Sequence, residues 1–175
     1  MATATLDEAE QVSESPFFFP VSIPKLVTLS VVTFGLYHLV WFYRNWALER
    51  ERSRFEEISP FWRTFFALFY CRSMFSLVRD EARARGIPAA YSAGWLAAAF
   101  ITLEFVAVRL PDPWWLVCLA GSIALVPVQR AANAVNAAER PRAATNARFT
   151  ALNWVVVAFG GLCLALAVVG TFVPE

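Results

Sequence analysis

The sequence is poor in charged residues and almost devoid of histidine. Charged residues make up 17% of the 175 positions, and His38 is the single histidine. An average soluble domain has about 25% charged residues. Hydrophobic residues reach 58% here, which is too high for an ordinary soluble domain and for a disordered chain. The net charge of +1 also argues against nucleic acid as the main partner, because such binders concentrate basic residues on one face. The remaining class is a small membrane protein with several spans.

Signals for catalysis and metal binding are missing as well. The cysteines Cys71, Cys118 and Cys163 lie far apart in apolar stretches, without a CxxC spacing or a nearby histidine. We therefore expect buried, unreactive thiols rather than a metal site or a disulfide framework. The motifs of serine hydrolases, zinc proteases and P-loop enzymes are also absent from the sequence. The sequence thus predicts no enzymatic activity, no catalytic residues, no cofactor and no metal.

Long apolar runs are what the chain does contain. A bilayer core about 30 Å thick requires about 20 apolar residues in a helix. Four runs fit this requirement and are predicted to span the membrane, namely residues 25–44, 91–108, 113–129 and 149–173. Residues 1–15 are acidic and are expected to form a disordered tail, because a targeting signal would be basic before its apolar core. We predict an all-α, polytopic transmembrane helical bundle, with residues 16–175 as a single membrane domain.

The aromatic stretch 60–78 decides between two topologies. Ser59 followed by Pro60 is typical of a helix start, but Arg72 lies well inside the stretch. An arginine at mid-membrane costs at least about 2.5 kcal/mol. If this stretch is an amphipathic or re-entrant helix, nearly all basic residues fall on the cytoplasmic side, as the positive-inside rule favours. We therefore prefer four spans with both termini outside, and five spans is the alternative.

Helix-boundary residues give further expectations. Asp112 before Pro113 predicts the start of the fourth span, whereas Pro127 is expected to kink or end it. The first span is expected to continue as a charged helix beyond Arg44, where Glu49 and Arg52 can pair.

Ionisable residues at membrane depth are the default functional candidates. Here they are His38, Arg72 and Glu104. A carboxylate and an imidazole could relay protons, and the arginine could hold an anion. The less functional alternative, which we favour, is that Glu104 pairs with Arg72 or Arg109 and that His38 donates to a backbone carbonyl.

A second group of polar side chains follows the fourth span. Gln129, Asn133 and Asn136 share one helical face. This face could bind a ligand or a partner. The interpretation that we prefer is a solvated face of a short interfacial helix.

Several blocks of the sequence look familiar, among them FPVSIPKLVTLSVVTFGLYHLVWFYRNW, ISPFWRTFFALFYC and NARFTALNWVVVAFGGL. Together they resemble a family of small uncharacterised bacterial integral membrane proteins, and the TFGLY…WFYRNW segment is similar to a domain of unknown function found in such proteins. The resemblance implies a multi-pass protein of the bacterial inner membrane, and it implies no activity or site residues.

Three functional hypotheses follow. The first is a non-enzymatic interaction or accessory protein, suggested by the missing catalytic motifs and the charged helical extension. Its partners would be the lipid bilayer and a second copy or another membrane protein. The second is a small oligomeric transporter or channel lined by the three ionisable residues. The third is lipid binding, suggested by the aromatic stretch beside arginines.

Overall fold

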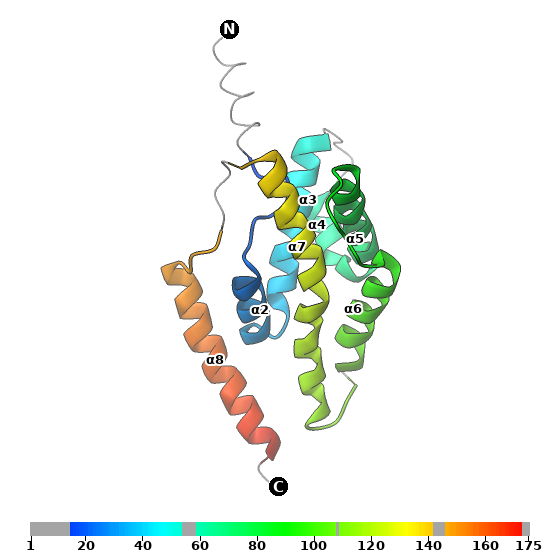
Figure 1. The fold of residues 1–175 in the computed structure, drawn as a ribbon. Coiled ribbons are helices and arrows are strands. Elements are labelled where there is room, and N and C mark those ends of the chain that lie inside the picture. Colours follow the sequence, from blue (N-terminus) through cyan, green and yellow to red (C-terminus); the bar gives the residue numbers. More distant parts are fainter. Residues whose placement is uncertain (1–14, 54–58, 108, 142–145, 173–175) are drawn as a thin grey trace.

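The fold is known from a computed structural model, which describes residues 15–53, 59–107, 109–141 and 146–172. Within these ranges the regular elements are helices, as predicted (Figure 1). They are α2 (Ile23–Val32), α3 (Leu36–Ser53), α4 (Pro60–Phe65), α5 (Ala67–Ala84), α6 (Ala93–Ala107), the 3-10 helix η1 (Trp114–Ala120), α7 (Gly121–Glu139) and α8 (Ala151–Phe172). The predicted acidic tail lies outside the described residues except for Ser15.

Two helices of the described part are long and apolar enough to cross a membrane. One is the continuous helix Trp114–Glu139, and the other is α8. With 22 residues, α8 is about 33 Å long, enough for a hydrocarbon core of about 30 Å. The helices α2 and α6 are also apolar but shorter.

The predicted span 25–44 is not one helix, and this prediction was wrong. The chain reverses at Phe34 and Gly35, which have φ angles of 52° and 87°. Thr33 supports the reversal, because its hydroxyl donates to Leu29 O at 2.6 Å and accepts from the N–H of Tyr37 at 3.0 Å. The side chain that ends α2 therefore also begins α3, and the two helices form a hairpin (Figure 1).

The hairpin packs against α8 through a glycine. A Cβ atom at Gly160 would overlap the carbonyl oxygen of Val32, the last residue of α2. Only glycine allows this close approach of helix to backbone. Gly160 lies near the middle of α8, about 15 Å from its start. The tip of the hairpin therefore reaches about half-way along α8.

The helix α7 is longer than expected. Pro127 lies inside it and neither ends it nor separates the following polar run, because α7 continues to Glu139. The short interfacial helix predicted after the fourth span is therefore the second half of α7.

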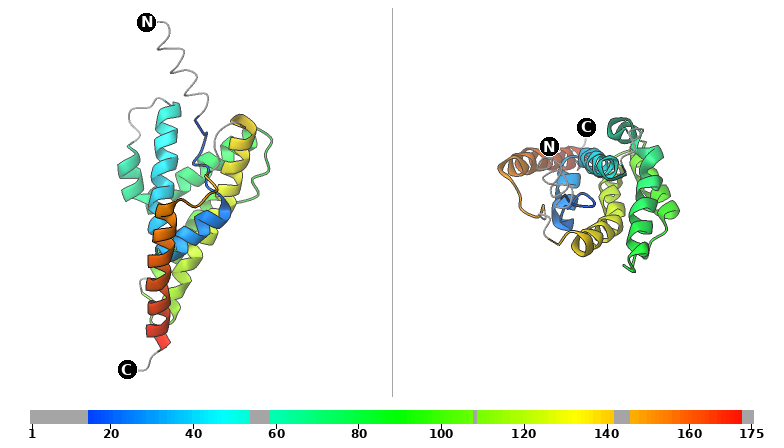
Figure 2. Two further views of the ribbon diagram at one scale, coloured as in Figure 1. Left: turned by 90° about the vertical axis from the view of Figure 1, so that its left-hand side faces the viewer. Right: turned by 90° about the horizontal axis from the view of Figure 1, so that it is seen from above.

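The aromatic stretch forms two helices. The Ser59 hydroxyl caps α4 by accepting from the N–H of Trp62 at 3.4 Å, as the sequence predicts. A break at Phe66 separates α4 from α5. From above, α5 is seen along its length whereas α3 is seen close to end-on (Figure 2), so α5 runs across the bundle. Large side chains of this stretch are exposed, namely Phe61, Trp62, Phe65, Phe66, Phe69 and Tyr70.

The charged residues gather where α3, α5 and α7 end. Arg52 pairs with Glu49 and with Glu81, and Arg85 pairs with Glu81 and with Glu139. The guanidinium of Arg52 also lies 3.7 Å from the ring centre of Phe17. The predicted Glu49–Arg52 pair is thus confirmed.

The two described ends of the chain lie at opposite ends of the bundle. Residues 15–21 lie at the charged end, and α8 finishes at the other (Figure 1). Four spans with both termini outside therefore stay a prediction. The hairpin accounts for the opposite positions of the two ends, because it returns the chain to the end from which it entered.

Candidate functional site

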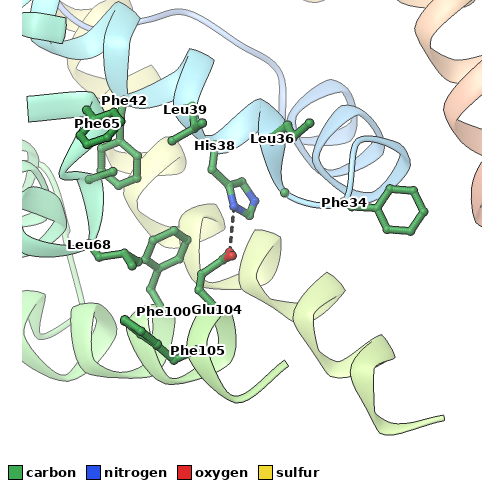
Figure 3. A pocket seen from close by; sticks show the side chains of 12 residues that line it. Phe34, Leu36, His38, Leu39, Phe42, Phe65, Leu68, Phe100, Glu104 and Phe105 are labelled. Atoms are coloured by element: carbon green, nitrogen blue, oxygen red, sulfur yellow. Dashed lines mark hydrogen bonds and ion pairs between the residues drawn. The ribbon is translucent and has the colours of Figure 1, made fainter. Parts of the chain in front are cut away.

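Two of the three ionisable candidates meet beside the tip of the hairpin. His38 lies in the first turn of α3 and Glu104 in the last turns of α6, and His38 Nδ1 is 3.0 Å from Glu104 Oε1 (Figure 3). His38 is 4% exposed, and the Glu104 side chain is 26% exposed. The acid and the imidazole thus share a hydrogen bond, and an ionised carboxylate would make this bond charge-assisted.

Arg72 is not part of this site. Its side chain is exposed on α5, and its Nε lies 4.0 Å from where a Cβ of Gly94 would be. The predicted pairing of Glu104 with Arg72 or Arg109 was therefore wrong, since the partner that the described residues provide is His38. The expected bond from His38 to a backbone carbonyl was wrong for the same reason.

Two glycines make room for the pair. A Cβ atom at Gly121 would lie 2.6 Å from Glu104 Oε1, and one at Gly35 would lie 3.4 Å from His38 Nδ1. Gly121 begins α7, while Gly35 belongs to the hairpin turn. The acid and the imidazole are thus enclosed where α3, α6 and α7 come together.

A pocket of about 350 Å³ opens beside the pair. Apart from His38 and Glu104 its described lining is apolar, with five phenylalanines, namely Phe34, Phe42, Phe65, Phe100 and Phe105. Three lining residues at its mouth remain largely exposed, at 67% for Leu36, 67% for Phe65 and 60% for Phe105. Small-molecule sites commonly have this size and an apolar wall with few polar groups.

Two buried polar atoms near the hairpin have no hydrogen-bond partner within the described residues. They are the Nε2 atom of His38 and the hydroxyl of Ser30. Buried polar groups are normally paired with protein or with water. The His38 imidazole therefore has one nitrogen committed to Glu104 and one still able to form a bond.

The polar face on α7 has a structural role instead of a solvated one. Gln129 is fully buried and Asn136 is 7% exposed, so the preferred interpretation of a solvated face was wrong. Asn136 donates to Phe18 O and accepts from the N–H of the same residue, both at 2.8 Å. Gln129 and Asn133 donate to Phe19 O and Val21 O, each at 2.9 Å.

The side chains of Gln129, Asn133 and Asn136 together form an amide clamp on the segment before α2. This role explains why amide side chains occur on an otherwise apolar helix. The segment before α2 is extended, so its backbone groups lack helical partners and must be satisfied by side chains. Asn45 on α3 completes the clamp by accepting from the N–H of Phe19 at 3.1 Å. Gln129 also accepts the indole N–H of Trp41.

No protein-family model, curated protein or solved structure matches the chain. The site must therefore be interpreted from its own geometry. No group of three or more potential metal-ligating side chains occurs among the described residues. What the arrangement offers is a carboxylate and an imidazole in the lining of an apolar, aromatic pocket.

Several contributors to the site were not predicted from the sequence. The pocket phenylalanines looked like ordinary apolar residues of membrane helices, and the glycines next to Glu104 carried no recognisable motif. Gly35, in the run TFGL, offered a weak signal, because glycine is common just past the end of a helix.

Proposed function

We propose that the chain is a multi-pass protein of the bacterial inner membrane. In this arrangement α6, the continuous helix of η1 with α7, and α8 cross the bilayer, and the α2–α3 hairpin enters and returns. The helices α4 and α5 lie in the interface. Exposed tryptophans support these boundaries, since Trp95 and Trp154 stand near the starts of α6 and α8 while Trp114 begins η1. Tryptophan is enriched at both membrane interfaces.

Positive charge orients the protein. The basic ends of α3, α5 and α7 are assigned to the cytoplasm by the positive-inside rule, which places the turn at Arg109 and the end of α8 outside. Alkaline phosphatase fused after Asp112 or after Glu175 should be active, and a fusion after Gly86 should be inactive. Activity after Gly86 would refute this topology, as would inactivity after Glu175.

We further propose that the protein binds a molecule dissolved in the bilayer. The supporting observation is the pocket beside the hairpin, with an apolar wall, an exposed mouth and the His38–Glu104 pair in its lining. In the proposed topology this mouth faces the lipid and extends from the interfacial helices α4 and α5 toward the hydrocarbon core, because the hairpin tip lies level with the middle of α8. A ligand would thus enter from the lipid and meet the His38–Glu104 pair as the polar part of the described lining.

Saturable photolabelling tests the binding role. The purified protein is labelled with an aryl diazirine in detergent, and the labelled residues are mapped with and without an excess of the same compound lacking the diazirine. Labelling of Leu39 and Phe105 in the pocket should be competed away, whereas labelling of Phe159 on the exposed side of α8 should not. Labelling that is equally uncompeted at all three residues would overturn the proposal.

Transport is the second candidate, and the hairpin favours it. Secondary transporters often place their sites where a membrane helix is broken, and here the polar pair lies beside such a break. Proteoliposomes with an internal pH dye provide the test. A proton flux that the wild type supports and Glu104→Gln abolishes would favour transport. Equal fluxes in the two proteins would leave binding without transport as the proposed role.

The interaction or accessory role and the binding of lipid headgroups remain predictions. For headgroups, the relevant feature is the exposed aromatic surface of α4 and α5. Next to this surface, Arg63 of α4 stacks on Trp46, with its guanidinium 4.4 Å from the ring centre. Arg72 of α5 is exposed as well.

A further inference from the structure

We propose that the ligand of the hairpin pocket is a lipophilic monocation, that is, a cationic centre surrounded by aromatic or alkyl groups. This inference rests on the proposed binding role and adds the charge and chemical class of the ligand. It follows from three properties of the pocket, which are its one acidic group, its aromatic wall and the distribution of basic residues.

The acidic group is Glu104, which has no cationic guanidinium or ammonium partner among the described residues. The described residue that contacts it is His38, and a pair with a neutral imidazole carries one negative charge. A carboxylate buried in an apolar setting is costly unless a cation accompanies it. The 26% exposure of the Glu104 side chain leaves part of it accessible to such a cation from the pocket.

The wall of the pocket suits the rest of such a molecule. Five phenylalanines line it, and the face of an aromatic ring carries negative potential that attracts cations. An attraction of this kind strengthens when the cation is desolvated. The same rings pack against apolar substituents. A cation with an apolar surface therefore suits both the negative potential of the ring faces and the apolar wall.

The positions of the basic residues argue against an anionic ligand. The described lining of the pocket includes neither lysine nor arginine. The arginines instead cluster at the far ends of α3 and α5, where Arg52 and Arg85 already have carboxylate partners. An anionic ligand would therefore meet a carboxylate without a compensating positive charge, and we expect it to be rejected.

Two ions of nearly equal shape and opposite charge test the proposal. Tetraphenylphosphonium and tetraphenylborate are titrated separately into the purified full-length protein by equilibrium dialysis, and the saturable component is measured. The phosphonium should bind saturably, at least tenfold more tightly than the borate. Glu104→Gln should weaken phosphonium binding at least tenfold, whereas Glu139→Gln, at the charged end of α7, should leave it unchanged.

A second pair of variants addresses the aromatic wall without risk to folding. Phe65 lines the pocket and is 67% exposed, while Phe69 is 80% exposed and is not among the lining residues. Phe65→Leu keeps apolar bulk but removes the ring face, and it should weaken phosphonium binding about threefold or more. Phe69→Leu should have no effect. Equal effects of both substitutions would contradict the assignment of the pocket.

The outcomes separate the two proposals. If photolabelling is saturable but the borate binds as well as the phosphonium, the pocket is a binding site and the charge assignment is wrong. If photolabelling is saturable and the phosphonium neither binds nor competes, the cation proposal is likewise refuted. If nothing in the pocket saturates, the binding role itself fails.

Discussion

His38 and Glu104 are 66 positions apart in the sequence and are joined by a contact of 3.0 Å between Nδ1 and Oε1. The contact exists because the chain reverses at Gly35, which brings the first turn of α3 against the last turns of α6. A continuous helix in place of the hairpin would carry the imidazole elsewhere along the bundle. The hairpin and the polar pair are therefore parts of one arrangement.

Loss of the Glu104 carboxylate should destabilise the fold. In Glu104→Ala the buried imidazole of His38 would lose its one described hydrogen-bond partner, since its Nε2 is already unpaired within the described residues. Leaving a buried polar group unsatisfied costs about 1–3 kcal/mol. The thermal midpoint in detergent should fall clearly for Glu104→Ala, and much less for Glu139→Ala, whose carboxylate is 40% exposed. Equal thermal midpoints for the two variants would show that the His38–Glu104 pair does not stabilise the fold.

The packing of the hairpin on α8 provides a matched pair of glycines. Gly160→Ala places a methyl group onto the carbonyl of Val32, whereas a Cβ atom at Gly161 meets nothing within 4 Å. Overpacking typically costs about 1–3 kcal/mol, so Gly160→Ala should lower the thermal midpoint. Gly161→Ala should leave the midpoint unchanged or raise it. If the two variants behave alike, α2 does not pack on α8 as described.

The amide clamp should be essential for holding the segment before α2. Asn136→Ala removes both hydrogen bonds to Phe18 and leaves that backbone N–H and carbonyl buried without these partners. We expect a loss of about 2 kcal/mol or more in the free energy of unfolding, because buried orphan groups each cost about 1–3 kcal/mol. Limited proteolysis should then cut near Phe18 in the variant. Ala138→Ser, on the exposed side of the same helix, is the control and should resist cleavage like the wild type.

The thiol of Cys71 should be unreactive toward alkylating reagents in the folded protein. Burial raises the pKa of its thiol to about 11, and the thiol group bonds to the carbonyl of Leu68 at 3.1 Å. Because the raised pKa favours the protonated form, the thiolate is scarce at pH 8 and becomes abundant only as the pH approaches 11. Alkylation depends on the thiolate, so N-ethylmaleimide at pH 8 should modify Cys71 about a hundredfold more slowly than the unfolded chain. Rapid modification of Cys71 in native protein would show that α5 does not bury it.

The sequence predicted elements better than their arrangement. The starts of α4 and α6, the charged continuation of α3 and the long apolar α8 follow from capping residues and hydropathy, which are local. The hairpin was missed because Thr33, Phe34 and Gly35 are compatible with an apolar helix, and the reversal depends on packing against α8 that no local pattern records.

The candidate site was predicted only in its outline. The cost of burying charge pointed to His38 and Glu104, and the same argument pointed wrongly to Arg72. That arginine is exposed on α5 and is not among the residues that line the pocket. The amides of α7 were correctly grouped on one face, but their true partner is an extended segment more than a hundred positions away, which periodicity cannot reveal.

The central claim is that the hairpin tip and its pocket lie at the depth of the bilayer core, and spin-label accessibility tests it most directly. Phe34→Cys and Phe159→Cys, each in a background lacking the native cysteines, are labelled with a nitroxide in liposomes. Phe34, at the tip, is 41% exposed, and Phe159, beside Gly160 on α8, is 71% exposed. Both labels should be readily accessible to oxygen and poorly accessible to a water-soluble nickel chelate. Ready access of the chelate to the label at position 34, with position 159 protected, would contradict the account.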